Sequence, residues 1–128
     1  EKGAYIVKMN SHDCKVTLVA SGSEVELALN VHDALQKNNI ESKVVSMPSQ
    51  ELFDKQTEDY KKSILDKESL IVTIEAGNVS SWKKYLGSNG ISLGINRFGE
   101  SAPYKKIYEH LNLSVEKIVI TIQDKLRK

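Results

Sequence analysis

Short runs of apolar residues alternate along the chain with longer stretches in which apolar residues recur every three or four positions. The clearest example runs from Val16 to Met47. The apolar run 16–20 is followed by the turn Ser21-Gly22-Ser23, by a helical pattern from about Glu24, and by the β-branched run 43–47. Strand, helix and strand predict a βαβ unit, whose two strands run parallel and are joined by a right-handed crossover.

The helix predicted from Glu24 has an unusually wide apolar face. The centre of that face has the spacing of a buried stripe and holds Leu27, Ala28, Val31, Ala34 and Leu35. The opposite face holds Glu26, Asn30, Asp33 and Lys37. Val25, Leu29 and His32 lie at the edge and widen the arc, so we assign His32 to the flank of the helix. We expect this flank to be covered by neighbouring elements or to contact another domain or subunit. Asn38-Asn39 ends the helix.

The rest of the chain continues the alternation of strands and helices. We expect an edge strand over 4–9 and buried strands over 69–74 and 91–95. Several side chains with the chemistry of helix N-caps predict where helices begin, namely Ser49, Thr57, Ser80 or Ser81, Ser101 and Ser114. The last helix has the most regular stripe: Val115, Ile118, Val119, Ile122 and Leu126. The pattern predicts one α/β domain over residues 1–128.

Composition excludes several classes of protein. The 18 basic and 17 acidic residues give a net charge of +1 and are well mixed, so neither a nucleic acid nor a basic partner is indicated. Cys14 is the only cysteine, which excludes an internal disulfide, and one Cys with three scattered His predicts no metal site. No apolar run approaches a membrane span, and no signal peptide opens the chain. We therefore expect a cytoplasmic protein. Because the chain begins at Glu1 without Met, we expect a fragment or a processed product.

The turn Gly22-Ser23 is the first candidate for binding chemistry. It lies between a strand and a helix, where free backbone N–H groups and the helix dipole attract anions. The turn has neither a GxGxxG fingerprint nor a P-loop around it. Glu24, in the first helical turn, would repel an anion. A tight turn that requires glycine is the stronger interpretation.

A second group of candidates lies at the ends of later strands. Glu75 ends a buried strand, where open α/β sheets place ligands, and it could act as a base or cap the next helix. Ser46 and Ser49 lie near such an edge, but no His and acid accompany them as in a triad. Arg97 with Glu100 could bind an anion or form an ion pair. The residues alone therefore indicate an α/β domain without an evident catalytic site.

Read in order, four segments resemble the C-terminal domain of transketolases. They are residues 16–28, residues 44–49 with 51–54, residues 75–77 (Glu-Ala-Gly), and residues 97–103 (Arg-Phe-Gly-Glu-Ser-Ala-Pro). Residues 108–111 and the helix from Ser114 continue the resemblance, which covers nearly all of the chain. Each segment alone is weak, but their combination in this order is specific. Two positions depart from the pattern: Gln50 stands where Trp is expected, and Asn96 stands where Asp is expected.

The resemblance implies a three-layer αβα fold with a five-stranded, mostly parallel mixed sheet. It also implies a longer homodimeric enzyme, with two thiamine domains upstream that bind thiamine diphosphate, a divalent metal (Mg²⁺ or Ca²⁺) and the sugar-phosphate substrates. Such an enzyme moves a two-carbon ketol unit from a ketose phosphate to an aldose phosphate in the pentose phosphate pathway. The C-terminal domain lies outside that active site, so we expect no catalytic, cofactor-binding or metal-binding residue in this chain, and we expect the isolated domain to be inactive.

Two alternatives remain open. One is a regulatory module that binds a small anion at Gly22-Ser23 or at the strand edge near Glu75. The other is the matching domain of a related thiamine enzyme, such as deoxyxylulose-phosphate synthase or the β subunit of a 2-oxo acid dehydrogenase. Segments 46–49 and 97–103 favour transketolase over these relatives.

Overall fold

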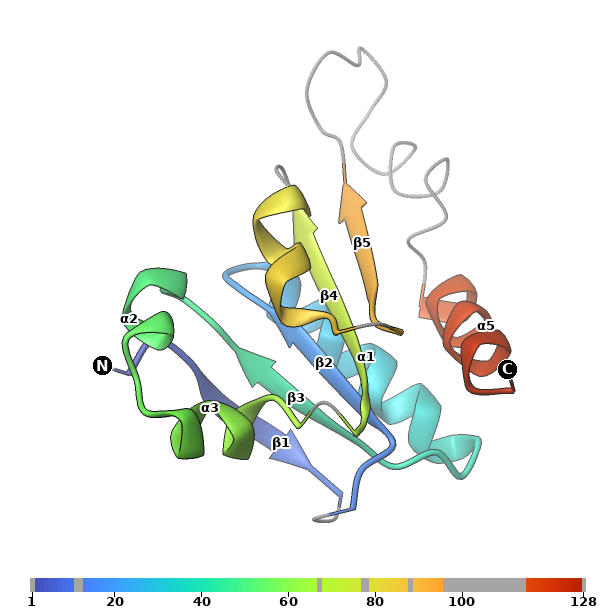
Figure 1. Cartoon of the computed structure of the whole chain (residues 1–128). Coiled ribbons are helices and arrows are strands. Elements are labelled where there is room, and N and C mark those ends of the chain that lie inside the picture. Colours follow the sequence, from blue (N-terminus) through green and yellow to red (C-terminus); the bar gives the residue numbers. More distant parts are fainter. Residues whose placement is uncertain are drawn as a thin grey trace, which may run out of the picture.

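The strands predicted from the apolar runs form one mixed sheet in the computed structural model (Figure 1). The structure describes residues 2–10, 13–66, 68–76, 79–87, 89–95 and 115–127. Within these residues the sheet has five strands: β1 Tyr5–Met9, β2 Val16–Ala20, β3 Ser42–Ser46, β4 Leu70–Ala76 and β5 Ile91–Ile95. Their spatial order is β1-β3-β2-β4-β5. β1 runs antiparallel to β3 at one edge, and the other neighbouring strands are parallel.

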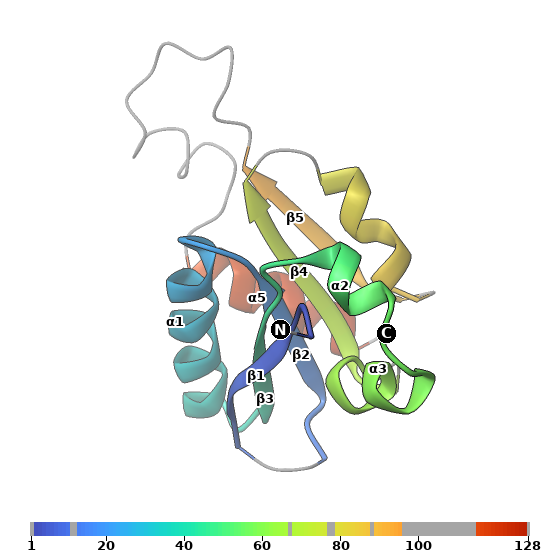
Figure 2. The ribbon, with the colours of Figure 1, turned by 90° about the vertical axis from the view of Figure 1, so that its left-hand side faces the viewer.

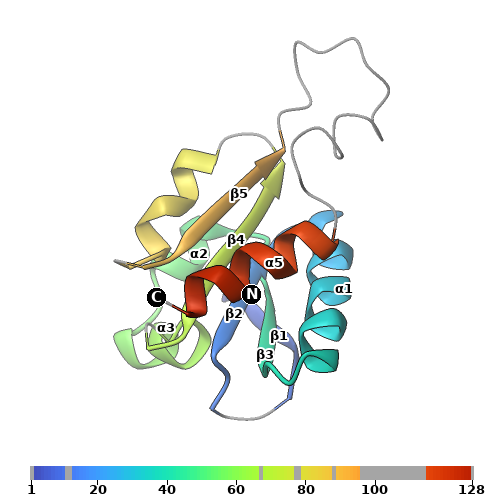
Figure 3. The ribbon, with the colours of Figure 1, turned by 90° about the vertical axis from the view of Figure 1, so that its right-hand side faces the viewer.

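Helices cover both faces of this sheet. α1 (Glu24–Lys37) and α5 (Val115–Leu126) lie on one face (Figure 3). α2 (Gln50–Asp54), α3 (Glu58–Ile64) and the 3₁₀ helix η1 (Val79–Tyr85) lie on the other face (Figure 2). Each face has its own cluster of buried apolar side chains. The expected three-layer αβα fold with a mixed sheet is therefore confirmed.

The central strands are continuous apolar runs because both of their faces are covered. On β2, Leu18 packs into the cluster under α1 and α5, whereas Val19 packs into the cluster under α2, α3 and η1. Both side chains are fully buried. Burial of one such side chain contributes about 2 kcal/mol to folding. The pairing of β2 with β3 confirms the parallel βαβ unit, with β3 displaced by one residue from its predicted position.

Polar side chains begin and end the helices as the sequence predicted. Ser49 Oγ accepts a hydrogen bond from the backbone N–H of Leu52 at 3.2 Å. Thr57 Oγ1 accepts one from Tyr60 at 3.1 Å. α1 ends at Lys37, after which Asn39 takes a left-handed conformation with φ of 62°. Side chains with suitable cap chemistry thus fix these boundaries.

One open prediction about helices is settled, and another is wrong. At His32 a neighbouring element covers the flank of α1: the side chain is fully buried, and its Nδ1 lies 2.7 Å from Ser42 Oγ on β3. α1 packs across β3, so position 32 faces the sheet. Ser80 and Ser81 do not precede the helix that holds Trp82, because η1 already begins at Val79 and is a 3₁₀ helix.

Some predictions fall on residues outside the described ranges. These are the turn at His12, the segment 96–103 with Arg97 and Glu100, the helix capped by Ser101, and the cap at Ser114. The helix that follows Ser114 is described as α5, and Ile118, Val119 and Ile122 of its predicted stripe are buried. No helix among the described residues is long and apolar enough to cross a membrane.

Candidate functional site

The carboxyl ends of β2, β3 and β4 meet at one edge of the sheet because these strands run parallel. β3 lies on one side of β2 and β4 lies on the other, so the direction in which strands are added reverses beside β2. In open α/β sheets, ligands bind outside the carboxyl ends of the strands at such a reversal. This edge, between β2 and β4, is the candidate functional site.

Side chains from four segments meet at this edge. Ser21 directly follows β2, and Glu75 is the last residue but one of β4. Ser21 Oγ donates a hydrogen bond to Glu75 Oε2 at 3.1 Å, which bridges the reversal point. Gln50, at the start of α2, donates from Nε2 to Ser81 Oγ of η1 at 3.4 Å. The sequence could place Glu75 and Ser21 at one edge, but it contained no signal that Gln50 and Ser81 join them.

These side chains line an open, shallow crevice of about 340 Å³. Its lining combines four hydrogen-bonding residues with three apolar ones: Ser21, Gln50, Glu75 and Ser81 with Met47, Pro48 and Trp82. None of these described lining residues is a Lys, Arg or His. The described lining therefore offers hydrogen-bonding groups and one carboxylate.

The turn at Gly22-Ser23 has the geometry of a tight strand-to-helix connection. Gly22 has a φ of +57°, which favours glycine, and no atom lies within 4 Å of the position that a Cβ would occupy. Ser23 Oγ donates to Glu24 Oε2 at 3.2 Å, and Glu24 is 5% exposed. Glu24 and Glu26 place two carboxylates in the first turn of α1, where they stabilise the helix end and oppose an anion. Anion binding at Gly22 and Ser23 stays a prediction.

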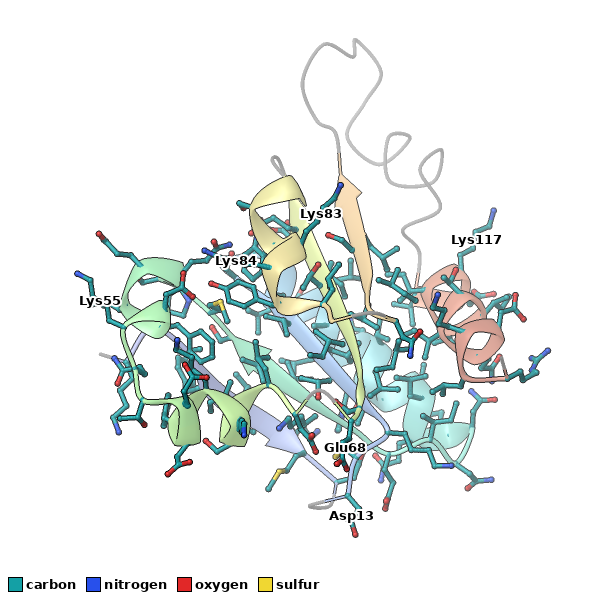
Figure 4. All side chains as sticks on the ribbon, in the orientation of Figure 1. Asp13, Lys55, Glu68, Lys83, Lys84 and Lys117 are labelled. Atoms are coloured by element: carbon teal, nitrogen blue, oxygen red, sulfur yellow. The ribbon has the colours of Figure 1, made fainter. Side chains whose placement is uncertain are left out.

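The other candidates within the described residues do not assemble into a catalytic group. Ser49 caps α2, and Ser46 is 7% exposed within β3. Among the described residues, no three His, Cys, Asp or Glu side chains are gathered as a metal site requires. Charged side chains are instead spread over separate elements: Figure 4 shows Lys55 after α2, Lys117 on α5 and Asp13 before β2 well apart from one another.

A hydrogen-bonded cluster that the sequence did not reveal lies between α2 and η1. Asp54 accepts a hydrogen bond from the Tyr85 hydroxyl at 2.8 Å and one from Lys84 Nζ at 2.7 Å. Burial and the bond to Asp54 raise the pKa of Tyr85 well above its usual range. Burial tends to raise the pKa of Asp54, but the bonds from Lys84 and Tyr85 outweigh it and lower that pKa. The cluster borders a groove of about 600 Å³ and ties α2 to η1.

Lys43 of β3 is a buried charged residue that the apolar pattern of the sequence did not reveal. Its side chain faces the layer of α3, where Nζ donates to the backbone oxygen of Ser63 at 3.2 Å. The residue is 8% exposed. Burial lowers the pKa of Lys43, while the carboxylate of Asp66 opposes this shift in part. Its single described hydrogen bond, to a backbone oxygen, indicates a structural role.

The geometry can be compared with proteins of known family. The family model described as "Transketolase-like TK C-terminal domain" matches residues 3–114. The chloroplastic transketolase of Craterostigma plantagineum is 42% identical over 127 residues, which are 97% of this chain and 24% of that enzyme.

Solved structures give the same result. The transketolase of Leishmania mexicana superposes with a TM-score of 0.85 at 36% identity, over 98% of this chain and 18% of that chain. A split-gene transketolase, described as an inactive β4 tetramer, has the same fold with a TM-score of 0.69 at 24% identity, over 99% of this chain and 43% of that chain. The chain thus spans a quarter or less of the full-length relatives described here.

Proposed function

The chain belongs to the transketolase family through its C-terminal domain, and from this premise we propose that it is the non-catalytic C-terminal part of a longer transketolase. That enzyme would transfer a two-carbon ketol unit from a ketose phosphate to an aldose phosphate. The observation that carries the proposal is the match over residues 3–114 together with 42% identity over 97% of the chain.

The described residues of this chain do not form a site that fits the cofactors of such an enzyme. Mg²⁺ and Ca²⁺ take carboxylate and carbonyl oxygens as ligands, and a diphosphate needs cations or a ring of backbone N–H groups. The described residues gather no acidic cluster of that kind, and the α1 N-terminus carries Glu24 and Glu26. We therefore assign thiamine diphosphate, its metal ion and the sugar phosphates to two upstream domains, and we assign no catalytic residue to residues 1–128.

The partners follow from the same proposal. The chain would contact the upstream domains of its own polypeptide, and the complete enzyme would act as a homodimer in the cytoplasm. The flank of α1 is the first candidate contact surface, because Val25 and Leu29 stay only partly buried within this chain. We propose no nucleic-acid partner, since the 18 basic and 17 acidic residues are mixed along the chain.

The proposal is tested by assaying ketol transfer in the longer protein and in the 128-residue chain alone. The longer protein should convert a ketose phosphate and an aldose phosphate in the presence of thiamine diphosphate and Mg²⁺. The chain alone should give no turnover, in keeping with the inactive state described for the split-gene relative. Absence of ketol transfer by the longer protein, with its cofactor bound, would contradict the proposal.

The alternative from a different class of protein is a regulatory module that binds anions. A thermal-shift series with phosphorylated sugars and nucleotides separates it from the main proposal. A concentration-dependent rise in melting temperature that Ser23→Glu abolishes would support the alternative. The carboxylate of Glu24 beside Ser23 favours the opposite result, in which these anions leave the melting temperature unchanged.

A further inference from the structure

The groove of about 600 Å³ beside the Asp54 cluster has an apolar floor and charged side chains at its rim. We propose that this groove binds a free amino acid with a large apolar side chain, in its zwitterionic form. The ligand's ammonium group would face Glu68, its carboxylate would face Lys62, and its apolar side chain would lie on the floor. This inference concerns described residues of the chain and does not depend on ketol transfer.

The walls of the groove are held in place by the fold. Its lining comes from four segments: α2, α3, the connection from α3 to β4, and η1. Asp54 of α2 accepts hydrogen bonds from Lys84 and Tyr85 of η1 at 2.7 and 2.8 Å, which fixes two of these segments to each other. A volume of about 600 Å³ is in the range of sites for small molecules. The groove is therefore formed before a ligand arrives.

The floor of the groove is apolar. Phe53 is 1% exposed, and Leu65 and Tyr85 are each 6% exposed, so these side chains present only an edge to the groove. The rings of Phe53 and Tyr85 meet edge to face, with their centroids 5.8 Å apart. An aromatic ring of a ligand can extend this edge-to-face packing. The floor thus favours a ligand with an aromatic or other large apolar group.

Four of the charged side chains at the rim neutralise one another. Lys84 Nζ lies 2.7 Å from Asp54 Oδ2. On α3, Lys61 Nζ lies 3.4 Å from Glu58 Oε2. These two ion pairs leave three charged lining residues, on α3 and on the connection to β4.

Of these three, Asp66 is engaged within the chain. Its Oδ1 accepts a hydrogen bond from the backbone N–H of Glu68 at 3.0 Å, and its carboxylate stabilises the positive charge of Lys43. The side chains of Lys62 and Glu68 are exposed, and neither has an ion pair or hydrogen bond with the described residues. One positive and one negative charge thus stay available at the rim.

This pair of opposite charges indicates a zwitterion. A ligand with only a negative charge would pair with Lys62 but be repelled by Glu68, and a ligand with only a positive charge would meet the reverse. A free amino acid carries both charges on neighbouring atoms and can satisfy both side chains. At an exposed rim, each such pairing should raise the affinity up to about fivefold.

L-Phenylalanine is the probe for this site. Titration of the 128-residue chain should give saturable shifts of the backbone amide signals of Glu68 and Tyr85 in a ¹H–¹⁵N NMR spectrum. Glycine, which lacks the apolar side chain, should bind about tenfold more weakly. Folding of the chain is supported by its two buried clusters and is checked for each variant by circular dichroism.

Two analogues and two variants separate the charged contacts. 2-Phenylethylamine lacks the carboxylate, 3-phenylpropanoate lacks the ammonium group, and each should bind about fivefold more weakly than phenylalanine. Lys62→Gln should weaken phenylalanine binding about fivefold but should not weaken binding of 2-phenylethylamine. Glu68→Gln should weaken phenylalanine binding to the same degree but should not weaken binding of 3-phenylpropanoate.

Lys55→Gln and Glu51→Gln are the matched controls. They make the same changes of charge on exposed residues that do not line the groove, and they should leave phenylalanine binding unchanged. Figure 4 shows Lys55 well apart from Glu68 and Lys84.

Three results would overturn the proposal. The first is a spectrum in which phenylalanine does not shift the signals of Glu68 and Tyr85. The second is unchanged phenylalanine binding by both Lys62→Gln and Glu68→Gln. The third is tighter binding of 2-phenylethylamine or of 3-phenylpropanoate than of phenylalanine, which would indicate a site for a cation or for an anion instead.

Discussion

Two glycines with positive φ show how differently single residues constrain this chain. Gly3 has a φ of +90°, and a Cβ there would collide with the backbone nitrogen of Phe53 and the backbone oxygen of Ser49. Gly22 has a φ of +57° but open space around it. Gly3 therefore lets the segment before β1 lie directly against α2, whereas Gly22 only permits a backbone conformation.

The two positions give a matched prediction for stability. Gly3→Ala should lower the free energy of unfolding by about 3 kcal/mol, since both the conformation and the packing against α2 are lost. Gly22→Ala should cost only about 1 kcal/mol, the price of a left-handed conformation for alanine. Urea denaturation of the two variants measures both values. Equal losses would show that the contact of Gly3 with α2 contributes little.

The protonation of His32 should make the free energy of unfolding depend on pH. Burial lowers its pKa, and the positive charge of Lys8 lowers it further, while the carboxylate of Asp33 opposes the shift. Nδ1 lies 2.7 Å from Ser42 Oγ, and Nε2 is buried without a hydrogen-bond partner among the described residues. Protonation would therefore put a charge, and a proton with no described acceptor, into the interior between α1 and β3.

This arrangement predicts a loss of stability in acid. Below about pH 6.5, the pKa of an unfolded histidine, the unfolded chain binds a proton that the folded chain excludes. The free energy of unfolding should thus be independent of His32 at higher pH and fall as the pH decreases through this range. His32→Asn keeps a polar group near the position of Nδ1 but does not titrate, so urea denaturation at several pH values should give a flatter profile for this variant. Parallel profiles would contradict the assignment.

At the scale of elements, the hydrophobic pattern predicts single strands, helices and helix caps. These features depend on residues that are close together in the sequence. Three features appear in the structure as predicted: the strand over 16–20, the burial of Ala28, Val31 and Leu35 on α1, and the caps Ser49 and Thr57. Leu27 and Ala34 of the predicted stripe are only partly buried, and Glu24 and His32 complete the buried face instead.

The pattern could not predict that η1 is a 3₁₀ helix or that Asp54 bonds Tyr85, since these depend on segments that are distant in sequence. For the same reason the pattern leaves open whether a neighbouring element covers His32, since its partner Ser42 belongs to the next strand.

The flank of α1 is the part of this helix that we expect to contact another domain or subunit in the longer enzyme. Leu29 lies one helical turn before Asp33, which pairs with Lys8 of β1 at 3.6 Å, so this flank and the edge strand are neighbours. β1 also exposes Tyr5 by 55%. Tyr5 and the flank of α1 are therefore apolar positions that the described residues of this chain leave partly exposed.

Replacing Val25 and Leu29 together by Ser tests this surface. In the isolated chain both side chains are partly buried, so the melting temperature should decrease moderately. In the longer enzyme the decrease should be larger and subunit assembly should weaken, because an interdomain contact is lost as well. Calorimetry and sedimentation of both proteins check this prediction. Equal decreases in the two proteins, with unchanged assembly, would argue against a buried contact at this flank.

At the scale of the whole molecule, the α/β architecture was predictable from the alternation of strands and helices, but the sheet order was not. Periodicity does not specify on which side of β2 each later strand is placed. The resemblance implied a five-stranded mixed sheet, which the structure confirms, but it did not give the order β1-β3-β2-β4-β5. The crevice between β2 and β4 depends on this order, so the sequence alone could not predict that Ser21 and Glu75 are neighbours.

The central claim is that this α/β domain belongs to an enzyme whose cofactor lies in other domains. Calorimetric titration of the 128-residue chain with thiamine diphosphate and Mg²⁺, followed by a coupled ketol-transfer assay, tests it most directly. We predict no heat of binding and no turnover. Saturable binding at about micromolar affinity, or any turnover, would contradict the account, because it would require a cofactor site within residues 1–128.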